Sequence, residues 1–307
     1  MTEQPCPAPA PADDPTAIAA VANLCALLDL EAVEVDLFRG RSSDPGWTRV
    51  YGGQVVAQAL MAASRTVGDD RLAHSLHAYF LRPGDPATPI VYHVTRERDG
   101  TSFATRRVTA VQHGRSIFTL TASFAVVEAG LEHAATMPLA PAPALLQSEA
   151  ALFLANADAT PEPWRTLWQQ RERPIEFRPV VPQDPFQPRR SEPAAQHWLR
   201  LAAPLPPAFA ADPTVARCLL AYASDMTLLD TCLLPHGVSW SDPALQAASL
   251  DHALWFHATP DLDDWHLFVQ DSPRATGGRG FNRGQVFAAG GTLVASVAQE
   301  ALIRHRG

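Results

Sequence analysis

Two polar residues interrupt runs that the sequence pattern marks as buried. Asp225 follows Tyr222 by three residues and precedes Leu229 by four, so it borders an apolar stripe of helical spacing. Gln299 falls on the otherwise apolar face of a predicted strand over residues 292–304. A carboxylate that loses hydration must find a partner, shift its pKa or take part in chemistry. The structural alternatives are an arginine partner for the acid and a backbone partner for the amide.

Several classes of protein are excluded by residues that the chain lacks. All 24 basic residues are arginine, which excludes Schiff-base enzymes, the P-loop lysine and Ser–Lys hydrolases. The net charge of −8 argues against a nucleic-acid partner. The four cysteines form no C-x-x-C pair and no H-E-x-x-H motif occurs, so we expect no metal and no cofactor. Without a signal-peptide core or an apolar run of ~18 residues, we expect a cytoplasmic protein with no membrane span.

The chain divides into two similar halves that are joined by a proline-rich segment. We expect a disordered tail over residues 1–15, a first half over 16–127, a linker over 128–172 and a second half over 173–307. A short helix over 148–156 is compatible with the linker sequence.

Each half is predicted to consist of a helix followed by antiparallel strands, which makes the fold class α+β. In the first half we expect helices over 17–30 and from Gly52 onward, then strands over 74–81, 90–97, 102–112 and 116–127. In the second half we expect strands over 175–181 and 197–201, one long helix from Val215 to Leu233, then strands over 247–257, 266–272, 279–288 and 292–304.

The two halves can be overlaid through their last strands. Matching the turn glycines Gly114 and Gly291 places Ala122 opposite Gln299. The second half therefore carries an amide where the first half carries a small apolar side chain.

Several long segments, in a fixed order, resemble one family. They are Tyr51-Gly-Gly-Gln-Val-Val-Ala-Gln-Ala-Leu, His74-Ser-Leu-His-Ala-Tyr-Phe-Leu-Arg-Pro-Gly-Asp, Arg98-Asp-Gly-Thr-Ser-Phe to Ala122-Ser-Phe, Ala221-Tyr-Ala-Ser-Asp, Leu250-Asp-His-Ala-Leu-Trp-Phe-His and Gln299-Glu. Over about residues 20–305 the chain resembles the acyl-CoA thioesterase II family, of the TesB type. The resemblance implies a double hotdog fold, in which each half wraps an antiparallel sheet around a long helix.

The resemblance also implies an activity and a site. Members of the family hydrolyse acyl-CoA to a free acid and CoA, with an Asp, a Ser or Thr, and a Gln that hold and activate water. On this sequence these residues are Asp225, Ser249 and Gln299. The Asp is then the general base, and the hydroxyl and amide orient the water without adding charge.

The entrance of the first helix is a candidate for substrate binding. Overlaying Gly52-Gly53-Gln54 on Ala223-Ser224-Asp225 places Gln54 opposite the acid. We expect Gly52 and Gly53 to serve a second, pseudo-equivalent pocket that lacks the matching glutamine, and hence one working site per chain. The oxyanion is expected to meet a backbone N–H near a helix end or break.

In the absence of lysine, arginines must meet the phosphates of CoA. The candidates are strand residues at pseudo-equivalent places, namely Arg106, Arg107, Arg279 and Arg283, each of which can equally form a surface ion pair.

A covalent serine mechanism is disfavoured. No G-x-S-x-G motif occurs, and in a regular strand His252 lies on the face opposite Ser249. His74 and His77 are expected to be structural hydrogen-bonding residues near the first helix.

Two other functions stay open at this point. One is a hotdog hydratase or dehydratase, a chemistry that usually pairs an Asp or Glu with a His. The other is an acyl-CoA-binding protein without catalysis. Because relatives of the family associate further, we expect a homodimer or homotetramer.

Overall fold

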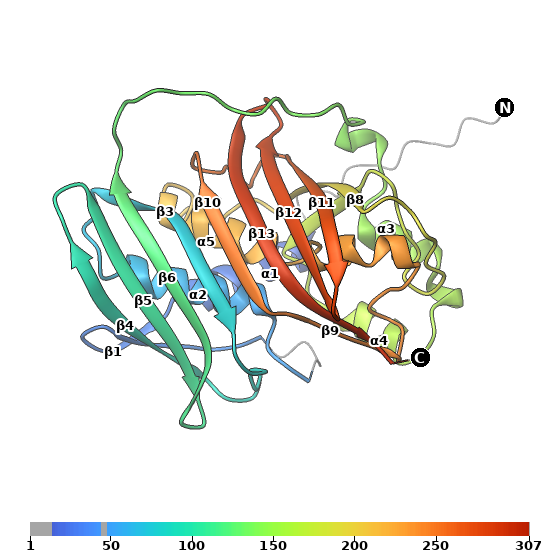
Figure 1. The fold of residues 1–307 in the computed structure, drawn as a ribbon, viewed down its shortest axis with the longest axis horizontal. Helices are drawn as coiled ribbons and strands as arrows, with labels where there is room; N and C mark the ends of the chain where they lie inside the picture. The colour runs from blue at the N-terminus through green and yellow to red at the C-terminus, as the bar shows by residue number, and fades with distance from the viewer. Residues whose placement is uncertain (1–13, 44–47, 307) are drawn as a thin grey trace.

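The computed structural model describes residues 14–43 and 48–306, so most of the predicted tail over 1–15 lies outside the described residues. All paired strands run antiparallel and join in one 13-stranded sheet, with α1, α2 and α5 on one side of it (Figure 1). The fold is α+β, as predicted.

The first half contains the two predicted helices and four predicted strands, and two short strands that were not predicted lie between the helices. Its elements are α1 (Pro15–Leu28), β1 (Glu31–Glu34), β2 (Leu37–Gly40), α2 (Gly52–Ser64), β3 (Arg71–Phe80), β4 (Ile90–Asp99), β5 (Phe103–Gln112) and β6 (Arg115–Val126). Asp14 caps α1 by accepting the Thr16 N–H, and Pro15 occupies the first helical position.

After β6 the chain runs along one edge of the molecule to reach the second half (Figure 1). The short elements here are η1 (Pro143–Leu145), α3 (Glu149–Ala155), η2 (Ala157–Ala159) and α4 (Trp164–Gln170). The α3 helix is the one predicted over 148–156, and Ser148 caps it.

The second half also has a helix followed by antiparallel strands, but its helix α5 is followed by two 3-10 turns, η3 and η4. Its elements are β7 (Ile175–Pro179), β8 (Ala194–Leu201), α5 (Pro213–Ser224), η3 (Leu229–Cys232), η4 (Leu234–His236), β9 (Leu245–Ser249), β10 (Asp251–Phe256), β11 (His266–Thr276), β12 (Arg279–Ala288) and β13 (Leu293–His305).

The predicted helix from Val215 to Leu233 is wrong, because α5 ends at Ser224 and Asp225 is its C-terminal cap. The chain then continues in tight turns, with i→i+3 bonds such as Leu233 N–H to Asp230 C=O. A 3-10 turn also buries about one residue in three, so the apolar stripe does not distinguish it from an α-helix.

The halves meet edge to edge at β3 and β10, in the middle of the sheet order β1-β2-β4-β5-β6-β3-β10-β13-β12-β11-β8-β7. Strand β9 lies off this path and pairs with β13. Behind the junction, α2 and α5 run antiparallel, so that the start of α2 meets the end of α5. Residues 53–63 of α2 are all buried, and this helix forms the centre of the main core.

Register details mark the halves as copies of one unit. The β5–β6 pairing skips Ile117, and the β12–β13 pairing skips Val294. The Ile117 carbonyl accepts the N–H groups of residues 81–82, just after β3, and the Val294 carbonyl accepts those of residues 257–258, just after β10. The strands of the two halves can therefore be matched residue by residue.

Candidate active site

The three residues predicted to hold water come together at the junction of the halves. Asp225 caps the end of α5, Ser249 ends β9, and Gln299 lies in β13. Ser249 Oγ donates to Asp225 Oδ1 at 3.2 Å, and Gln299 Nε2 donates to the same oxygen at 2.5 Å. Gln299 Nε2 also lies 3.2 Å from Ser249 Oγ. One carboxylate oxygen thus receives both a hydroxyl and an amide donor.

The surroundings of Asp225 make it a stronger base than an ordinary aspartate. Burial raises the pKa of Asp225 to about 6, while hydrogen bonds from Gln299, Ser249 and the Gly53 backbone N–H act in the opposite direction. The side chain is only 4% exposed. An acid with this pKa is mostly ionised at neutral pH and accepts a proton more readily than an exposed carboxylate.

The glycine pair at the start of α2 contacts this acid directly. A Cβ on Gly52 would lie 2.6 Å from Asp225 Oδ2, and one on Gly53 would lie 2.4 Å from the Tyr222 carbonyl oxygen. Glycine at both positions therefore lets the positive end of the α2 dipole approach the carboxylate. The expectation that Gly52-Gly53 serves a second pocket is wrong, because the antiparallel helix pair brings this entrance to Asp225.

Gln54, which the overlay placed opposite Asp225, does not join the site. Its amide is 2% exposed and donates to Ser42 Oγ and the Arg41 carbonyl oxygen. These hydrogen bonds hold residues 41–42, which precede α2, against the helix.

His252 lies beside the three residues, which corrects the prediction that it faces the other way. The chain from Ser249 to Ala253 advances four residues while its partners on β13, Ala301 to Ala298, advance three. The extra residue is a bulge at Leu250, and it returns His252 to the face of Gln299. His252 is fully buried, and its Nδ1 lies 3.2 Å from Gln299 Nε2.

The sequence pattern alone missed His252, although a signal for it exists. In the register of the sheet, Leu76 of the first half occupies the place of His252. Extending the overlay from the last strand to the first would have shown a leucine replaced by a histidine.

A second buried amide lies next to Gln299. Asn282 on β12 is opposite Gln299 in the strand pairing, and both side chains are 0% exposed. Among residues 14–43 and 48–306, Gln299 Oε1 has no hydrogen-bond partner, and the amide atoms of Asn282 have no nitrogen or oxygen partner and face the Cys232 thiol. Polar atoms placed this way can bind a polar group of a ligand.

The four arginines predicted to meet CoA phosphates do not gather at one place. Arg106 is 1% exposed on its side chain and pairs with Asp99 at 2.6 Å, so it lies in the interior of the first half. The other three are about half exposed, and each pairs with an acid on the sheet: Arg107 with Glu97, Arg279 with Glu300 and Arg283 with Asp271.

The two histidines predicted to be structural, His74 and His77, lie on β3 and contact neighbouring strands. His74 Nε2 lies 2.8 Å from Ser123 Oγ, and the His77 ring packs edge-on against Trp255. Within residues 14–43 and 48–306, no group of three or more potential metal-ligating side chains is found.

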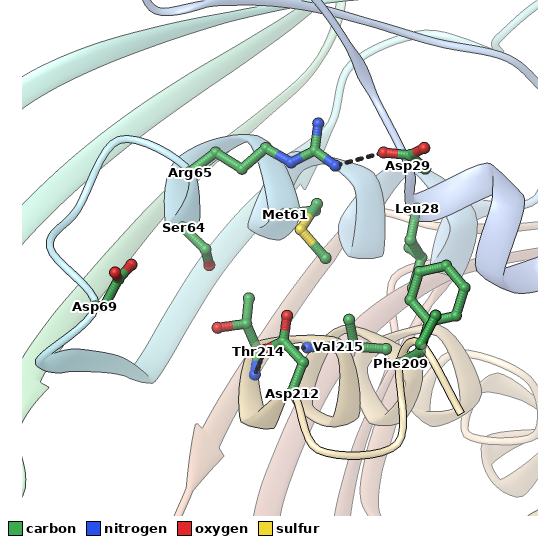
Figure 2. A pocket seen from close by; sticks show the side chains of 11 residues that line it. Leu28, Asp29, Met61, Ser64, Arg65, Asp69, Phe209, Asp212, Thr214 and Val215 are labelled. Carbon is green, nitrogen blue, oxygen red and sulfur yellow. Dashed lines mark hydrogen bonds and ion pairs between the residues drawn. The ribbon is translucent and has the colours of Figure 1, made fainter. Parts of the chain in front are cut away.

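Two cavities lie away from Asp225. One of about 300 Å³ lies at the opposite end of the helix pair, between Met61 near the end of α2 and Asp212 and Val215 at the start of α5, with Arg65 at its edge paired to Asp29 (Figure 2). The other, of about 260 Å³, lies beside β9 and is lined by Leu245, His236, Arg279 and His305 among others. No helix in the described part of the chain is long and apolar enough to cross a membrane.

Comparison with protein families matches both halves. Residues 42–125 match the model described as the acyl-CoA thioesterase N-terminal domain, and residues 165–302 match the model described as acyl-CoA thioesterase.

Individual proteins match over nearly the whole chain. Acyl-CoA thioesterase 2 of Haemophilus influenzae is 41% identical over 282 residues, which cover 92% of this chain and 97% of that protein. The solved structure of the acyl-CoA thioesterase II TesB2 from Mycobacterium marinum is 39% identical, with a TM-score of 0.74 over 92% of this chain and 98% of that one. A protein with a hot dog fold from Alicyclobacillus acidocaldarius matches with a TM-score of 0.70 at 19% identity, covering 92% of this chain and 98% of that one. The double hotdog fold is thereby confirmed.

Proposed function

This chain belongs to the acyl-CoA thioesterase family and hydrolyses acyl-CoA thioesters, and on that premise we propose that Asp225 is the general base, with Ser249 and Gln299 holding the attacking water. The observation that supports this assignment is the convergence of both donors on Asp225 Oδ1, within 3.2 Å. Ionised Asp225 accepts one hydrogen bond from the water, and Gln299 Oε1, which has no partner among the described residues, accepts the other. Ser249 fixes the water through Asp225, to which its hydroxyl donates.

The reaction then proceeds in two steps. The water oxygen bonds to the thioester carbonyl carbon while its proton passes to Asp225, which gives a tetrahedral oxyanion. The carbon–sulfur bond next breaks, the carbonyl re-forms, and the proton on Asp225 passes to the leaving thiolate. The products are a carboxylic acid and CoA, and Asp225 returns to its starting state.

The start of α2 stabilises the oxyanion in this proposal. The helix has no side-chain cap, and its N-terminal end meets Asp225 at Gly52 and Gly53. The Gly53 N–H already donates to Asp225, so another backbone N–H of this first turn, together with the helix dipole, stabilises the oxyanion. Such stabilisation is worth about 3–4 kcal/mol in known oxyanion holes.

The direct test is release of free thiol from acyl-CoAs of several chain lengths, followed with a chromogenic thiol reagent. We expect turnover by the wild-type chain and a loss of kcat of about 10²–10⁴-fold in Asp225→Asn. Wild-type kcat in a folded Asp225→Asn variant would rule out Asp225 as the base.

The same variant carries its own folding control. Burial raises the pKa of Asp225 above its value in an unfolded chain, so the ionised carboxylate opposes folding above that value. Asparagine carries no charge, and we therefore expect Asp225→Asn to melt at pH 8 no lower than the wild type.

For the CoA phosphates we propose Arg279 as the first ligand among the predicted arginines. It lines the cavity beside β9 together with His236 and His305, and its side chain is 49% exposed. Arg279→Gln should raise KM for acyl-CoA with little change in kcat, whereas the equally exposed Arg107→Gln is the matched control. Equal KM values in both variants would argue against this assignment.

We also propose that the hotdog units span residues 16–127 and 173–307, with 128–172 as linker, since β6 ends at Val126 and β7 begins at Ile175.

Exposed Tyr79, Phe103 and Phe281 on the sheet support a homodimer or homotetramer, which light scattering can test. A cytoplasmic role in fatty acid metabolism agrees with three buried free cysteines.

A further inference from the structure

His252 joins the reacting residues to the end of α5. Its Nδ1 lies 3.2 Å from Gln299 Nε2, and its Nε2 lies 2.9 Å from Ser224 Oγ. Ser224 precedes Asp225 directly, and its hydroxyl donates to the Ala221 carbonyl oxygen at 3.0 Å. All three side chains of the chain Ser224–His252–Gln299 are 0% exposed.

These contacts determine which nitrogen of His252 carries the proton. A serine hydroxyl has one hydrogen, and Ser224 Oγ lies within donor distance of the Ala221 carbonyl oxygen, which favours the arrangement in which Ser224 Oγ accepts from His252 Nε2–H. Nδ1 then carries a lone pair and accepts a hydrogen bond from Gln299 Nε2. Burial lowers the pKa of His252 to about 4, which keeps the ring neutral at the pH where the enzyme works.

The opposite arrangement is unfavourable. A proton on Nδ1 would face the amide N–H of Gln299. Rotating the amide by half a turn would accommodate that proton, but it would set the amide oxygen against Asp225 Oδ1, where Nε2 now lies at 2.5 Å. Two acceptors at that distance repel each other while the acid is ionised.

We propose that His252, held in one tautomer by Ser224, is a positioning residue that orients the Gln299 amide for catalysis. This inference rests on the proposed function of Gln299. With its N–H groups directed to Asp225, Ser249 and His252, the amide turns its oxygen away from the acid and toward the water.

The position equivalent to His252 in the first half shows which side chain the sheet accepts where no catalytic role is proposed. Leu76 occupies the place of His252, and Ala122 occupies the place of Gln299. Both are fully buried in the core. A leucine is therefore compatible with this fold, and His252→Leu copies a side chain that the duplicated scaffold already accepts.

The decisive experiment is a double-mutant cycle on kcat with His252→Leu and Gln299→Ala. His252→Leu should lose about 10- to 100-fold in kcat with little change in KM, because it leaves the amide free to rotate. Adding it to Gln299→Ala should change kcat by less than about twofold, since the residue through which it acts is gone. Losses that multiply in the double variant would overturn the proposal.

Two further variants guard against a merely structural effect. His252→Asn keeps an acceptor near the position of Nδ1, so it should retain more activity than His252→Leu. His266→Leu removes another buried histidine of the same half, on β11, and should leave kcat unchanged. Equal loss in the Asn and Leu variants, or in His266→Leu, would contradict a positioning role.

The tautomer itself can be read in the wild-type chain, which avoids any question of folding. In ¹⁵N-histidine NMR spectra the signal lost in His252→Asn should show a proton on Nε2 and none on Nδ1. A proton on Nδ1 would overturn the proposal. If Gln299→Ala keeps wild-type kcat, the proposed function of Gln299 fails instead.

Discussion

The two halves present the same four positions on the inner face of the sheet, and all four side chains differ. In register, the first half carries Ala73, Leu76, Ala122 and Arg106 where the second half carries Ser249, His252, Gln299 and Asn282. The backbones agree even in their irregularities, since the bulge at Leu250 matches the one after Ala73. At these four positions the first half is packed core, whereas the second half carries the polar side chains to which we assign the site.

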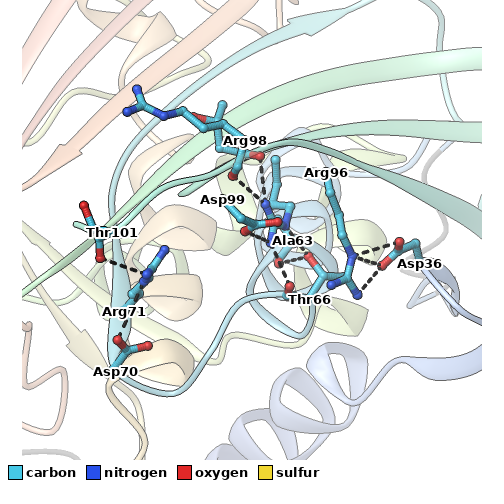
Figure 3. Close-up of polar contacts among 11 residues, drawn as sticks. Asp36, Ala63, Thr66, Asp70, Arg71, Arg96, Arg98, Asp99 and Thr101 are labelled. Atoms are coloured by element: carbon cyan, nitrogen blue, oxygen red, sulfur yellow. Dashed lines mark hydrogen bonds and ion pairs between the residues drawn. The ribbon is translucent and has the colours of Figure 1, made fainter. Parts of the chain in front are cut away.

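Arg106 shows how the first half fills its interior. Its guanidinium donates to Asp99 Oδ1, to Thr66 Oγ1 and to backbone carbonyls, including that of Arg98. Thr66, Arg98 and Asp99 lie together near the end of α2 (Figure 3). At the matching place in the second half Asn282 is shorter, and among the described residues its amide has no nitrogen or oxygen partner. The filled position explains why one site per chain is expected.

The largest contrast is expected between the two glutamines. Gln299→Ala removes the amide that contacts Asp225 and should lower kcat by about 10²–10³-fold. Gln54→Ala removes an amide of the first half that bonds only to residues 41 and 42, so its kcat should stay within a few-fold of wild type. Steady-state thiol release measures both. A similar loss of kcat in the two variants would break the comparison between the halves.

The second contrast concerns stability. Arg106→Leu should lower the free energy of unfolding by about 3 kcal/mol, because it leaves the Thr66 hydroxyl and the carbonyls of Thr66 and Arg98 without their charged donor. Arg107→Leu, on the exposed face beside it, should change it by less than about 1 kcal/mol. Urea unfolding measures both values. A raised KM for acyl-CoA with unchanged stability would instead make Arg106 a substrate ligand.

A smaller effect on kcat is expected from a substitution at Gly52, the residue of the first half that lies against Asp225. Gly52→Ala places a methyl group 2.6 Å from Asp225 Oδ2, so the carboxylate must move. We expect kcat to fall by about tenfold, as for modest misplacement of a reacting group. Gly130→Ala, where the added methyl group meets nothing within 4 Å, serves as the control. Unchanged kcat in Gly52→Ala would mean that the start of α2 does not position Asp225.

Most strands could be predicted from sequence because alternation and turn residues are local signals, but β1 and β2 were missed and the strand predicted over 247–257 is divided into β9 and β10. The strand over 279–288 was predicted with the bounds that β12 has. The break after Ser224 could not be predicted, because Met226, Leu229 and Leu233 continue the apolar spacing through 3-10 turns. The polar contact that accompanies this break, Thr231 Oγ1 to Gln270 on β11, joins residues distant in sequence.

The site was predicted in part for the same reason. Asp225 and Gln299 stand out against apolar neighbours, so their burial could be foreseen. The orientation of His252 depends on a bulge at Leu250, which reverses which residues of the strand face the core. The residue types around Leu250 do not indicate this bulge. The role of Gly52 depends on the antiparallel contact of α2 with α5, which only the tertiary fold establishes.

The dependence of kcat/KM on pH tests most directly whether a desolvated carboxylate of the second half is the base. Because the ionised form of Asp225 is active and burial raises its pKa to about 6, kcat/KM should be constant above about pH 7. It should fall to half near pH 6 and then about tenfold per pH unit below that. A profile that stays flat down to pH 5, or an acidic limb that persists unchanged in Asp225→Asn, would contradict the account.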